Sequence, residues 1–201
     1  MTREKGNRSS ALFFIFTEGT RTEPIYFGDT RTFRKGGKAP RINPHAECRK
    51  GTCVNNMKEW VDELIKKKKI RKGDTVWIVI DKDQNQRPDL NRFRAWCRNN
   101  NRINIKIAFS NPQFELWYLL HFICVEEEIE GEKVIEDLSE KLGERYDKAK
   151  NYNSVLSPLM NVALDNADAI REDIADNKKC DCNPFTSVDS LVKDLKKYLR
   201  E

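Results

Sequence analysis

Long apolar stretches are absent from this chain of 201 residues. No run approaches the ~20 apolar residues that a membrane-spanning helix needs. The first apolar run, ALFFIF at residues 11–16, falls short of the roughly 7–15 apolar residues of a signal peptide, and no small-residue cleavage site follows it. Charged residues make up 34% of the chain, which favours a soluble protein. We therefore expect a cytoplasmic protein with no membrane partner.

Internal repeats and low-complexity linkers are also absent. A chain of this length is typical of one domain with one sizeable core. Its character changes after residue 125, because strands alternate with helices before that point and only helical patterns follow it. We expect an α/β core at residues 1–125 and a helical C-terminal extension at 126–201 that packs on it, forming one structural domain overall.

Closely paired cysteines are the third absence. None of the six cysteines belongs to the C-x-x-C pair that is typical of structural zinc sites. In a cytoplasmic chain we expect reduced thiols and no disulfide framework. The sequence leaves open whether a zinc site joins two groups of candidate ligands, which are His45, Cys48, Cys53, Cys180 and Cys182.

The apolar patterns predict the secondary structure of the first 125 residues. Short apolar runs predict strands at residues 11–17, 41–48, 76–80 and 103–109. Helical periodicity and start signals predict helices at residues 22–35, 55–69, 88–100 and 111–123. This alternation predicts a mostly parallel α/β sheet flanked by helices. Beyond it we predict only helices, at residues 126–142, 156–174 and 188–199.

Carboxylates follow two of the predicted strands directly. The stretch VWIVIDKDQN places Asp81 and Asp83 after a buried strand, and Glu18 follows the first strand. Ligands of open α/β sheets bind beyond the carboxyl ends of the strands, so we expect the three side chains at one edge. There they would repel one another and raise each other's pKa. A Mg²⁺ (or Mn²⁺) ion bound by all three removes this repulsion, whereas the alternative is a polar turn after the strand.

Five further residues are candidates for supporting such a site. Glu23 is predicted either to approach the metal or to take part in capping the helix that starts near it. Ser110 and Asn111 follow the third long strand and either cap the next helix or bind phosphate at its N-terminus. Glu115 lies on an apolar helix, where a carboxylate needs a partner or a metal. Lys148 is predicted to meet a phosphate or to be solvated.

Basic residues are grouped along the chain, which has a net charge of +5. Such groups supply phosphate contacts in nucleic-acid-binding proteins, but they also mark solvated helix faces. One large group spans residues 66–72. The candidates that we single out for contact with nucleic acid are Arg21, Arg34, Lys35 and Lys38.

Several segments resemble one protein family. They are TEGTRTEPIYF at residues 17–27, the DKD at residues 81–83, SNPQFELWYLLHF at residues 110–122, YDK at residues 146–148 and NPFTSVDSLV at residues 183–192. Together they resemble RloB-like proteins from about residue 11 to residue 195. The SNP motif is long and therefore specific, whereas DKD alone arises easily by chance.

The resemblance implies a fold and an activity. RloB-like proteins belong to the Toprim superfamily, which implies a compact parallel sheet with a glutamate after the first strand and a D-x-D pair that binds Mg²⁺. Carried over, Glu18 is the acid/base or a metal ligand, and Asp81 and Asp83 are the D-x-D ligands. The resemblance also implies a nuclease acting on DNA or RNA, encoded beside an ATPase partner in prokaryotic phage defence or abortive infection. No tyrosine stands out as a nucleophile, which favours metal-assisted hydrolysis.

Two other functions fit parts of the pattern. A strand followed by D-x-D also opens phosphatases of the haloacid-dehalogenase type, but that reading leaves Glu18 without a role and needs another acidic pair. The other alternative is a nucleic-acid-binding or regulatory subunit that does not cleave. The sequence leaves open the choice between DNA and RNA, the trigger and the oligomeric state.

Overall fold

Five strands form one sheet, in the spatial order β2-β1-β3-β4-β5. The computed structural model describes residues 10–44, 53–82, 87–100, 103–177 and 182–201. The first four strands run parallel, and the fifth runs antiparallel to its neighbour β4. Their bounds are β1 (Phe13–Thr17), β2 (Arg41–Pro44), β3 (Thr75–Asp81), β4 (Asn104–Asn111) and β5 (Phe185–Thr186).

The order of the strands reverses between β1 and β3. The chain leaves β1 for β2 on one side and later returns to β3 on the other side. In open α/β sheets this reversal point is where ligands bind, at the carboxyl ends of the strands. The sheet therefore offers one preferred position for a site, and it lies between the ends of β1 and β3.

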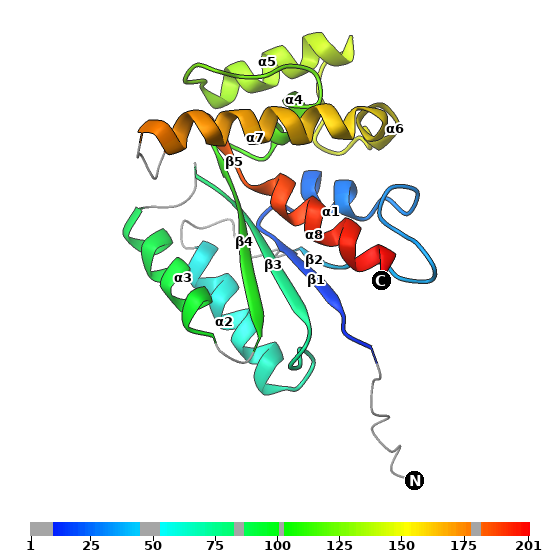
Figure 1. Cartoon of the computed structure of the whole chain (residues 1–201), viewed down its shortest axis with the longest axis vertical. Coiled ribbons are helices and arrows are strands. Elements are labelled where there is room, and N and C mark those ends of the chain that lie inside the picture. Colours follow the sequence, from blue (N-terminus) through cyan, green and yellow to red (C-terminus); the bar gives the residue numbers. More distant parts are fainter. Residues whose placement is uncertain (1–9, 45–52, 83–86, 101–102, 178–181) are drawn as a thin grey trace.

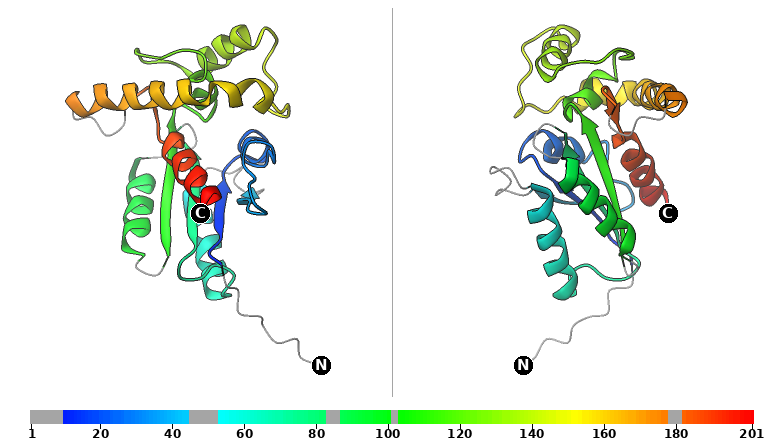
Figure 2. Two further views of the ribbon diagram at one scale, coloured as in Figure 1. Left: turned by 45° about the vertical axis from the view of Figure 1, so that its right-hand side comes forward. Right: turned by 90° about the vertical axis from the view of Figure 1, so that its left-hand side faces the viewer.

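Helices cover both faces of the sheet (Figure 1). Alternate side chains of a strand point to opposite faces, so Ile15 belongs to one apolar cluster while Phe14 and Phe16 belong to the other. The Ile15 face packs against α1 (Thr22–Phe27) and α8 (Val188–Arg200), and the other face against α2 (Cys53–Lys66) and α3 (Arg87–Asn99). Figure 2 shows these layers from two more directions.

A further helical layer lies beyond the carboxyl ends of the strands (Figure 1). It shares the apolar cluster of the α1 and α8 face, through fully buried side chains such as Trp117, Leu138 and Ala163. Its elements are α4 (Glu115–Leu119), α5 (Gly131–Leu142), α6 (Asn153–Leu156), the 3-10 turn η1 (Ser157–Leu159) and α7 (Met160–Asn177).

The predicted fold class is confirmed: the protein is a mixed α/β structure with a mostly parallel sheet flanked by helices and a helical C-terminal region. The prediction that the C-terminal part contains only helices is wrong, because β5 joins the edge of the sheet. This strand has only two residues, so its sequence carries no periodic signal. Within the described residues, no helix is both long enough and apolar enough to cross a membrane.

Two predicted helices are much shorter in the structure than the sequence indicates. The helix expected at residues 111–123 is reduced to α4, because β4 continues through Asn111. The residue before a proline is restricted to extended backbone, so Pro112 keeps Asn111 in the strand. The helix expected at residues 22–35 ends at Phe27. After it the carboxylate of Asp29 accepts hydrogen bonds from the backbone N–H groups of Arg31 and Thr32, and this turn replaces the helix.

The candidate zinc ligands can be placed only in part. His45, Cys48 and Cys180 lie outside the described residues. Cys182 is half-buried, and its carbonyl oxygen accepts a hydrogen bond of 2.8 Å from the Asn111 side chain.

A buried ion pair fastens β5 and α8 to the rest of the fold. Asp189 is fully buried and pairs with Arg171 of α7, and Lys193 approaches its Oδ2 atom to 3.2 Å. Arg171 also donates a hydrogen bond of 3.1 Å to the carbonyl oxygen of Thr186 in β5. The pair therefore holds β5 against β4 at the edge where the predicted site residues lie.

Replacing Asp189 by asparagine should lower the free energy of unfolding by about 2–4 kcal/mol, because it takes the fully buried carboxylate away from the partly buried guanidinium of Arg171, which keeps its pair with the more exposed Asp168. Asp194→Asn on the same helix is the matched control, since Asp194 pairs with Lys106 at the surface and should contribute less than about 1 kcal/mol. Urea unfolding of both variants measures the difference. Equal losses would contradict a special role for the buried pair.

Candidate carboxylate site

Two carboxylates meet where the strand order reverses. Glu18 directly follows β1, and its backbone N–H donates a hydrogen bond of 3.2 Å to the carbonyl oxygen of Val79 in β3. Asp81 is the last residue of β3, and its backbone N–H donates a hydrogen bond of 3.3 Å to Oε2 of Glu18. The pairing of β1 with β3 thus brings together two of the residues that the sequence singled out.

The surroundings of these carboxylates suit a hard cation. Both residues are half-buried, and Oε1 of Glu18 and Oδ1 of Asp81 are shielded from solvent. Two carboxylates at such a place disfavour each other's ionised form unless a cation neutralises them. Oxygen ligands of this kind are those that Mg²⁺ prefers. Asp83, the third expected ligand, lies outside the described residues, among which no group of three or more metal-ligating side chains is found.

A third carboxylate, Glu23, lies against the turn that follows β1. Glu23 is in the first turn of α1 and is 5% exposed. Its Oε1 atom accepts a hydrogen bond of 3.0 Å from the backbone N–H of Gly19. A Cβ atom at Gly19 would lie only 2.1 Å from Oε2 of Glu23, so the contact requires glycine. The E-G pair at residues 18–19 therefore provides one carboxylate and makes room for another.

Glu115 forms the centre of a buried polar cluster, although it lies on an otherwise apolar helix. It is 2% exposed, and its Oε1 atom accepts hydrogen bonds from Oγ1 of Thr22 at 3.3 Å and from the hydroxyl of Tyr146 at 3.1 Å. The Nζ atom of Lys148 lies 3.5 Å from the same oxygen. Three segments that are distant in the sequence thus meet beside α1, and this explains how a carboxylate is accommodated in the core.

The environment of Glu23 shifts its acidity. Burial raises the pKa of Glu23 to about 7, the negative charge of Glu115 acts in the same direction, and the N–H of Gly19 and the charge of Lys148 oppose both. The pKa of the Tyr146 hydroxyl is raised by its burial and by Glu115, so this group remains a hydrogen-bond donor at neutral pH. Glu23 is consequently able to exchange a proton near pH 7.

Ser110 and Asn111 do not take the predicted capping position. They belong to β4, where Ser110 lies opposite Asp81 in the strand register, and they neither cap α4 nor lie in its first turn. The hydroxyl of Ser110 lies 3.2 Å from that of Thr186. The Asn111 side chain donates its hydrogen bond to the carbonyl of Cys182. Both residues therefore join β4 to the segment that contains β5.

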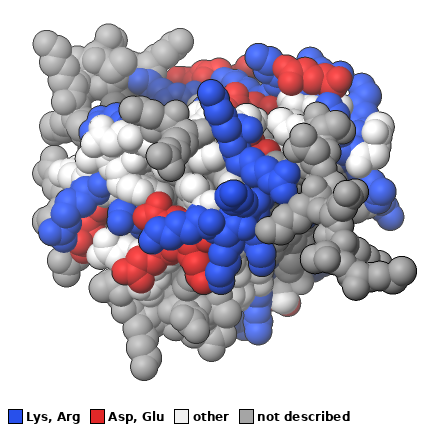
Figure 3. All heavy atoms as spheres, turned by 90° about the horizontal axis from the view of Figure 1, so that it is seen from below, with Lys and Arg blue, Asp and Glu red and all other residues white. Residues whose placement is uncertain are grey.

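The basic candidates lie on different segments of the described chain. Arg21 precedes α1 and is exposed there, and Arg34 and Lys35 are exposed farther along the chain. Lys38 donates a 3.5 Å hydrogen bond to the carbonyl of Tyr198 and lies over its ring. The basic group at residues 66–72 connects α2 to the start of β3, at the opposite end of the sheet from the carboxylates. Figure 3 shows the molecule from this lower side, with basic and acidic side chains interspersed.

The sequence pattern missed three residues around these carboxylates. Gly19, Thr22 and Tyr146 were not predicted as site residues, although each belongs to a stretch that carried the family resemblance. The YDK stretch contained the signal, because its tyrosine and its lysine both reach Glu115 in the structure.

Comparison with known proteins identifies a family. The family model described as RloB-like protein matches residues 13–195 of this chain. The match covers every segment described above for the carboxylates and their supporting cluster. No curated protein and no solved structure matches the chain.

Replacing Glu23 by glutamine should change the pH dependence of stability. The folded-state pKa of about 7 lies above the ordinary value of 4.5, so the carboxyl of Glu23 favours folding below pH 4.5 and loses this contribution as the pH rises to 7. Glutamine does not titrate. Without metal, the stability of Glu23→Gln relative to wild type should therefore increase by up to about 3 kcal/mol between pH 4.5 and 7.

Urea unfolding in EDTA at pH 4, 5, 6, 7 and 8 measures this change. The matched control is Glu63→Gln, because Glu63 is exposed on α2 and the pKa of its carboxyl is lowered by its hydrogen bond to Lys67. A difference between Glu23→Gln and wild type that stays constant over this range would show that Glu23 does not titrate as described.

Proposed function

Because this chain belongs to the RloB-like protein family, we propose that it is a metal-dependent nuclease of the Toprim type, which hydrolyses phosphodiester bonds in DNA or RNA. The observation that carries the proposal is the hydrogen bond from the backbone of Asp81 to the carboxylate of Glu18. It brings the Glu18 carboxylate to the backbone of Asp81 at the reversal point of the sheet, where α/β proteins bind their ligands, and this supports a shared site for the two residues.

Glu18 and Asp81 are the residues that would hold Mg²⁺ or Mn²⁺ in this proposal, and Asp83 would complete the D-x-D pair. When bound, such an ion polarises a phosphoryl oxygen and lowers the pKa of an attacking water molecule. The structure supports the assignment through the oxygen-only donor set and the shielding of one oxygen of each carboxylate.

Glu23 is our candidate for proton transfer. A carboxyl group with a pKa of about 7 both accepts and releases a proton at neutral pH, which is the requirement for a general acid/base. Its carboxylate accepts a hydrogen bond from the N–H of Gly19, which is the residue next to Glu18 in the chain. Glu115 then acts through its neighbours: it holds Tyr146, Thr22 and Lys148, and its charge contributes to the raised pKa of Glu23.

The phosphatase alternative receives little support from the sheet. A phosphatase of the haloacid-dehalogenase type needs a second acidic pair after another strand, but β4 ends in Ser110 and Asn111 and β5 ends in Thr186. The nuclease proposal also gives Glu18 a role. A non-cleaving nucleic-acid-binding or regulatory subunit is the remaining alternative.

We also propose that an ATPase partner controls the activity and that the pair acts in prokaryotic phage defence or abortive infection. Family membership supports this part of the proposal. A physical reason adds to it, since an uncontrolled nuclease would attack the nucleic acid of its own cell.

Glu18→Gln and Asp81→Asn should each lower the rate of cleavage at least about 100-fold, because each removes a charged metal ligand while keeping the shape of the side chain. Asp62→Asn is the matched control: Asp62 pairs with Lys58 on α2, on the other face of the sheet, and its loss should leave the rate unchanged. Rates are measured on plasmid, single-stranded DNA and total tRNA with Mg²⁺ or Mn²⁺, and with EDTA.

The assay is run with and without the ATPase partner, because the partner could be required for activity. Wild-type rates in both carboxylate variants would exclude the proposed site. If all substrates stay intact under all conditions and Asp81→Asn binds nucleic acid as well as the wild type does, the protein is a binding subunit that does not cleave.

A further inference from the structure

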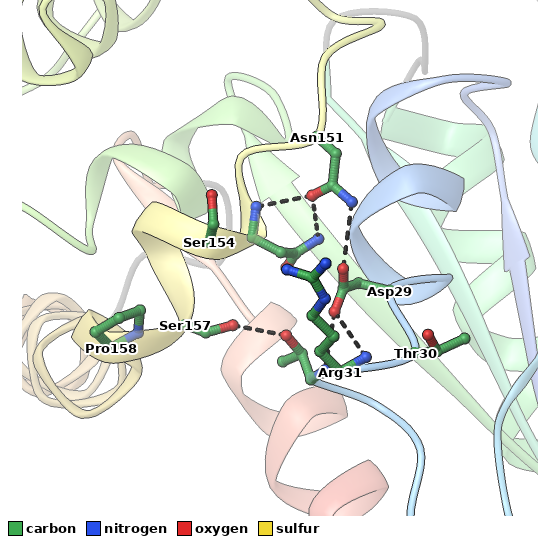
Figure 4. Close-up of a pocket in the computed structure, with 9 residues that line it drawn as sticks. Asp29, Thr30, Arg31, Asn151, Ser154, Ser157 and Pro158 are labelled. Carbon is green, nitrogen blue, oxygen red and sulfur yellow. Dashed lines mark hydrogen bonds between the residues drawn. The ribbon is translucent and has the colours of Figure 1, made fainter.

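A polar pocket of about 500 Å³ lies at the far end of α1 from the carboxylates. One wall is the loop of residues 29–32 that follows α1, and the other is the segment of residues 151–158 that contains α6 and η1. Figure 4 shows that the side chain of Arg31 reaches from the loop toward the segment of Asn151 and Ser154. The volume is in the range of pockets that hold a small organic ligand.

Hydrogen bonds between the walls hold this pocket open before any ligand arrives. The Asn151 amide donates to Oδ2 of Asp29 at 3.2 Å, and the hydroxyls of Thr32 and Ser157 lie 2.6 Å apart. The other oxygen of Asp29 accepts the two backbone N–H groups of its own loop. A ligand would therefore bind without having to order these groups, which lowers the cost of binding.

Asn153 gives the pocket lining a chemical preference. Its side chain is 3% exposed, and its Nδ2 atom donates to the carbonyl of Tyr26 at 3.2 Å and to Oδ1 of Asn151 at 3.1 Å. These two acceptors fix the orientation of the amide. The Oδ1 atom of Asn153 is then a buried acceptor, and none of the described residues donates a hydrogen bond to it. Buried polar atoms are normally paired, so an acceptor without a donor among the described residues is unusual.

The two sides of the pocket together select a class of ligand. Arg31 is exposed, and a guanidinium is suited to binding phosphate. The exposed hydroxyl of Ser154 both donates and accepts hydrogen bonds. A nucleotide combines a phosphate with donors on its base and sugar. We propose that the pocket binds one nucleotide of the substrate strand, an inference that rests on the proposed nuclease function.

Two segments lead from the carboxylates to this pocket. Helix α1 begins at the Glu23 end and stops two residues before Asp29, a path of six residues or about 9 Å at 1.5 Å per residue. The second segment starts at Tyr146, which bonds to Glu115, and reaches the pocket at Asn151, with the exposed Lys148 between them. At about 3.4 Å per nucleotide of a stacked strand, the length of α1 corresponds to two or three nucleotides. The pocket would thus hold the strand on one side of the cleaved bond.

The first test is a titration of the ¹⁵N-labelled full chain in EDTA with AMP, CMP, GMP, UMP and deoxythymidine monophosphate. Backbone amide signals of residues 29–32 and 151–157 should shift. Arg31→Gln should weaken binding about tenfold through the loss of a charge-assisted hydrogen bond. The matched control is Arg34→Gln, an equally exposed arginine that does not line the pocket and should bind as wild type does.

A second pair of variants tests the pocket by filling it. Ser154 and Val155 are neighbours on α6 and both are exposed, but only Ser154 is part of the pocket lining. Ser154→Phe should abolish nucleotide binding, whereas Val155→Phe should retain it. Three results would each overturn the proposal. The amide signals could shift only outside residues 29–32 and 151–157, or Arg31→Gln and Arg34→Gln could weaken nucleotide binding equally. The third is that inorganic phosphate binds as tightly as a nucleotide.

The strand and a free nucleotide are distinguished with a short oligonucleotide. If the pocket holds the strand, Arg31→Gln raises KM for its cleavage about tenfold and leaves kcat unchanged, and the oligonucleotide competes with AMP. Failure to compete would assign the pocket to a free nucleotide and overturn the proposal as stated. If cleavage depends on Glu18 but nucleotides do not shift the amide signals of the pocket residues, this inference alone is rejected. If nucleotides shift those signals in Glu18→Gln as well, and the wild type does not cleave, the nuclease proposal alone is rejected.

Discussion

The pairing of β1 with β3 is the constraint on which the rest of the structure depends. It continues one residue beyond β1, since the N–H of Glu18 bonds to Val79, and the N–H of Asp81 then bonds to the Glu18 carboxylate. Both strands are buried on both faces, so their register is fixed by two apolar clusters at once. A slip by one residue would bury polar side chains and separate the two carboxylates. The same packing that stabilises the sheet therefore sets the geometry of the proposed site.

Beside this pair, the protein places two more carboxylates where burial is costly. Glu23 and Glu115 are both almost fully buried, and the charge of Glu115 disfavours ionisation of Glu23. Glu115 is compensated by two hydroxyl donors and by Lys148, whereas Glu23 retains a pKa of about 7. A core made only for stability would hold apolar residues at these positions. The raised pKa of Glu23 is a cost to stability at neutral pH, and the proposed role in proton transfer would account for it.

Helix α1 connects the two polar regions of the molecule. Its first turn carries Thr22 and Glu23 toward the carboxylates, and the loop after it carries Asp29 and Arg31 into the pocket. The opposite side of α1 is anchored in the core by Tyr26 and Phe27, which pack against Phe33 and Phe114. This anchoring keeps the ends of a short helix in place relative to the sheet. It gives the proposed nucleotide pocket a fixed position with respect to the proposed site of cleavage.

The sequence by itself determined the sheet and the position of its two end carboxylates. Strong apolar runs define β1 and β3, and residues that directly follow parallel strands must share one edge, so Glu18 and Asp81 were predictable from local signals. Only the tertiary structure decided the meeting of Thr22 with Glu115, which are 93 residues apart, the pairing of the two-residue β5, and the end of α1 at the Asp29 turn. The physical reason is that these features depend on contacts between distant segments, whereas periodicity reports only which face of an element is buried. The pocket between residues 29–32 and 151–158 belongs to the same class, because neither segment indicates its partner.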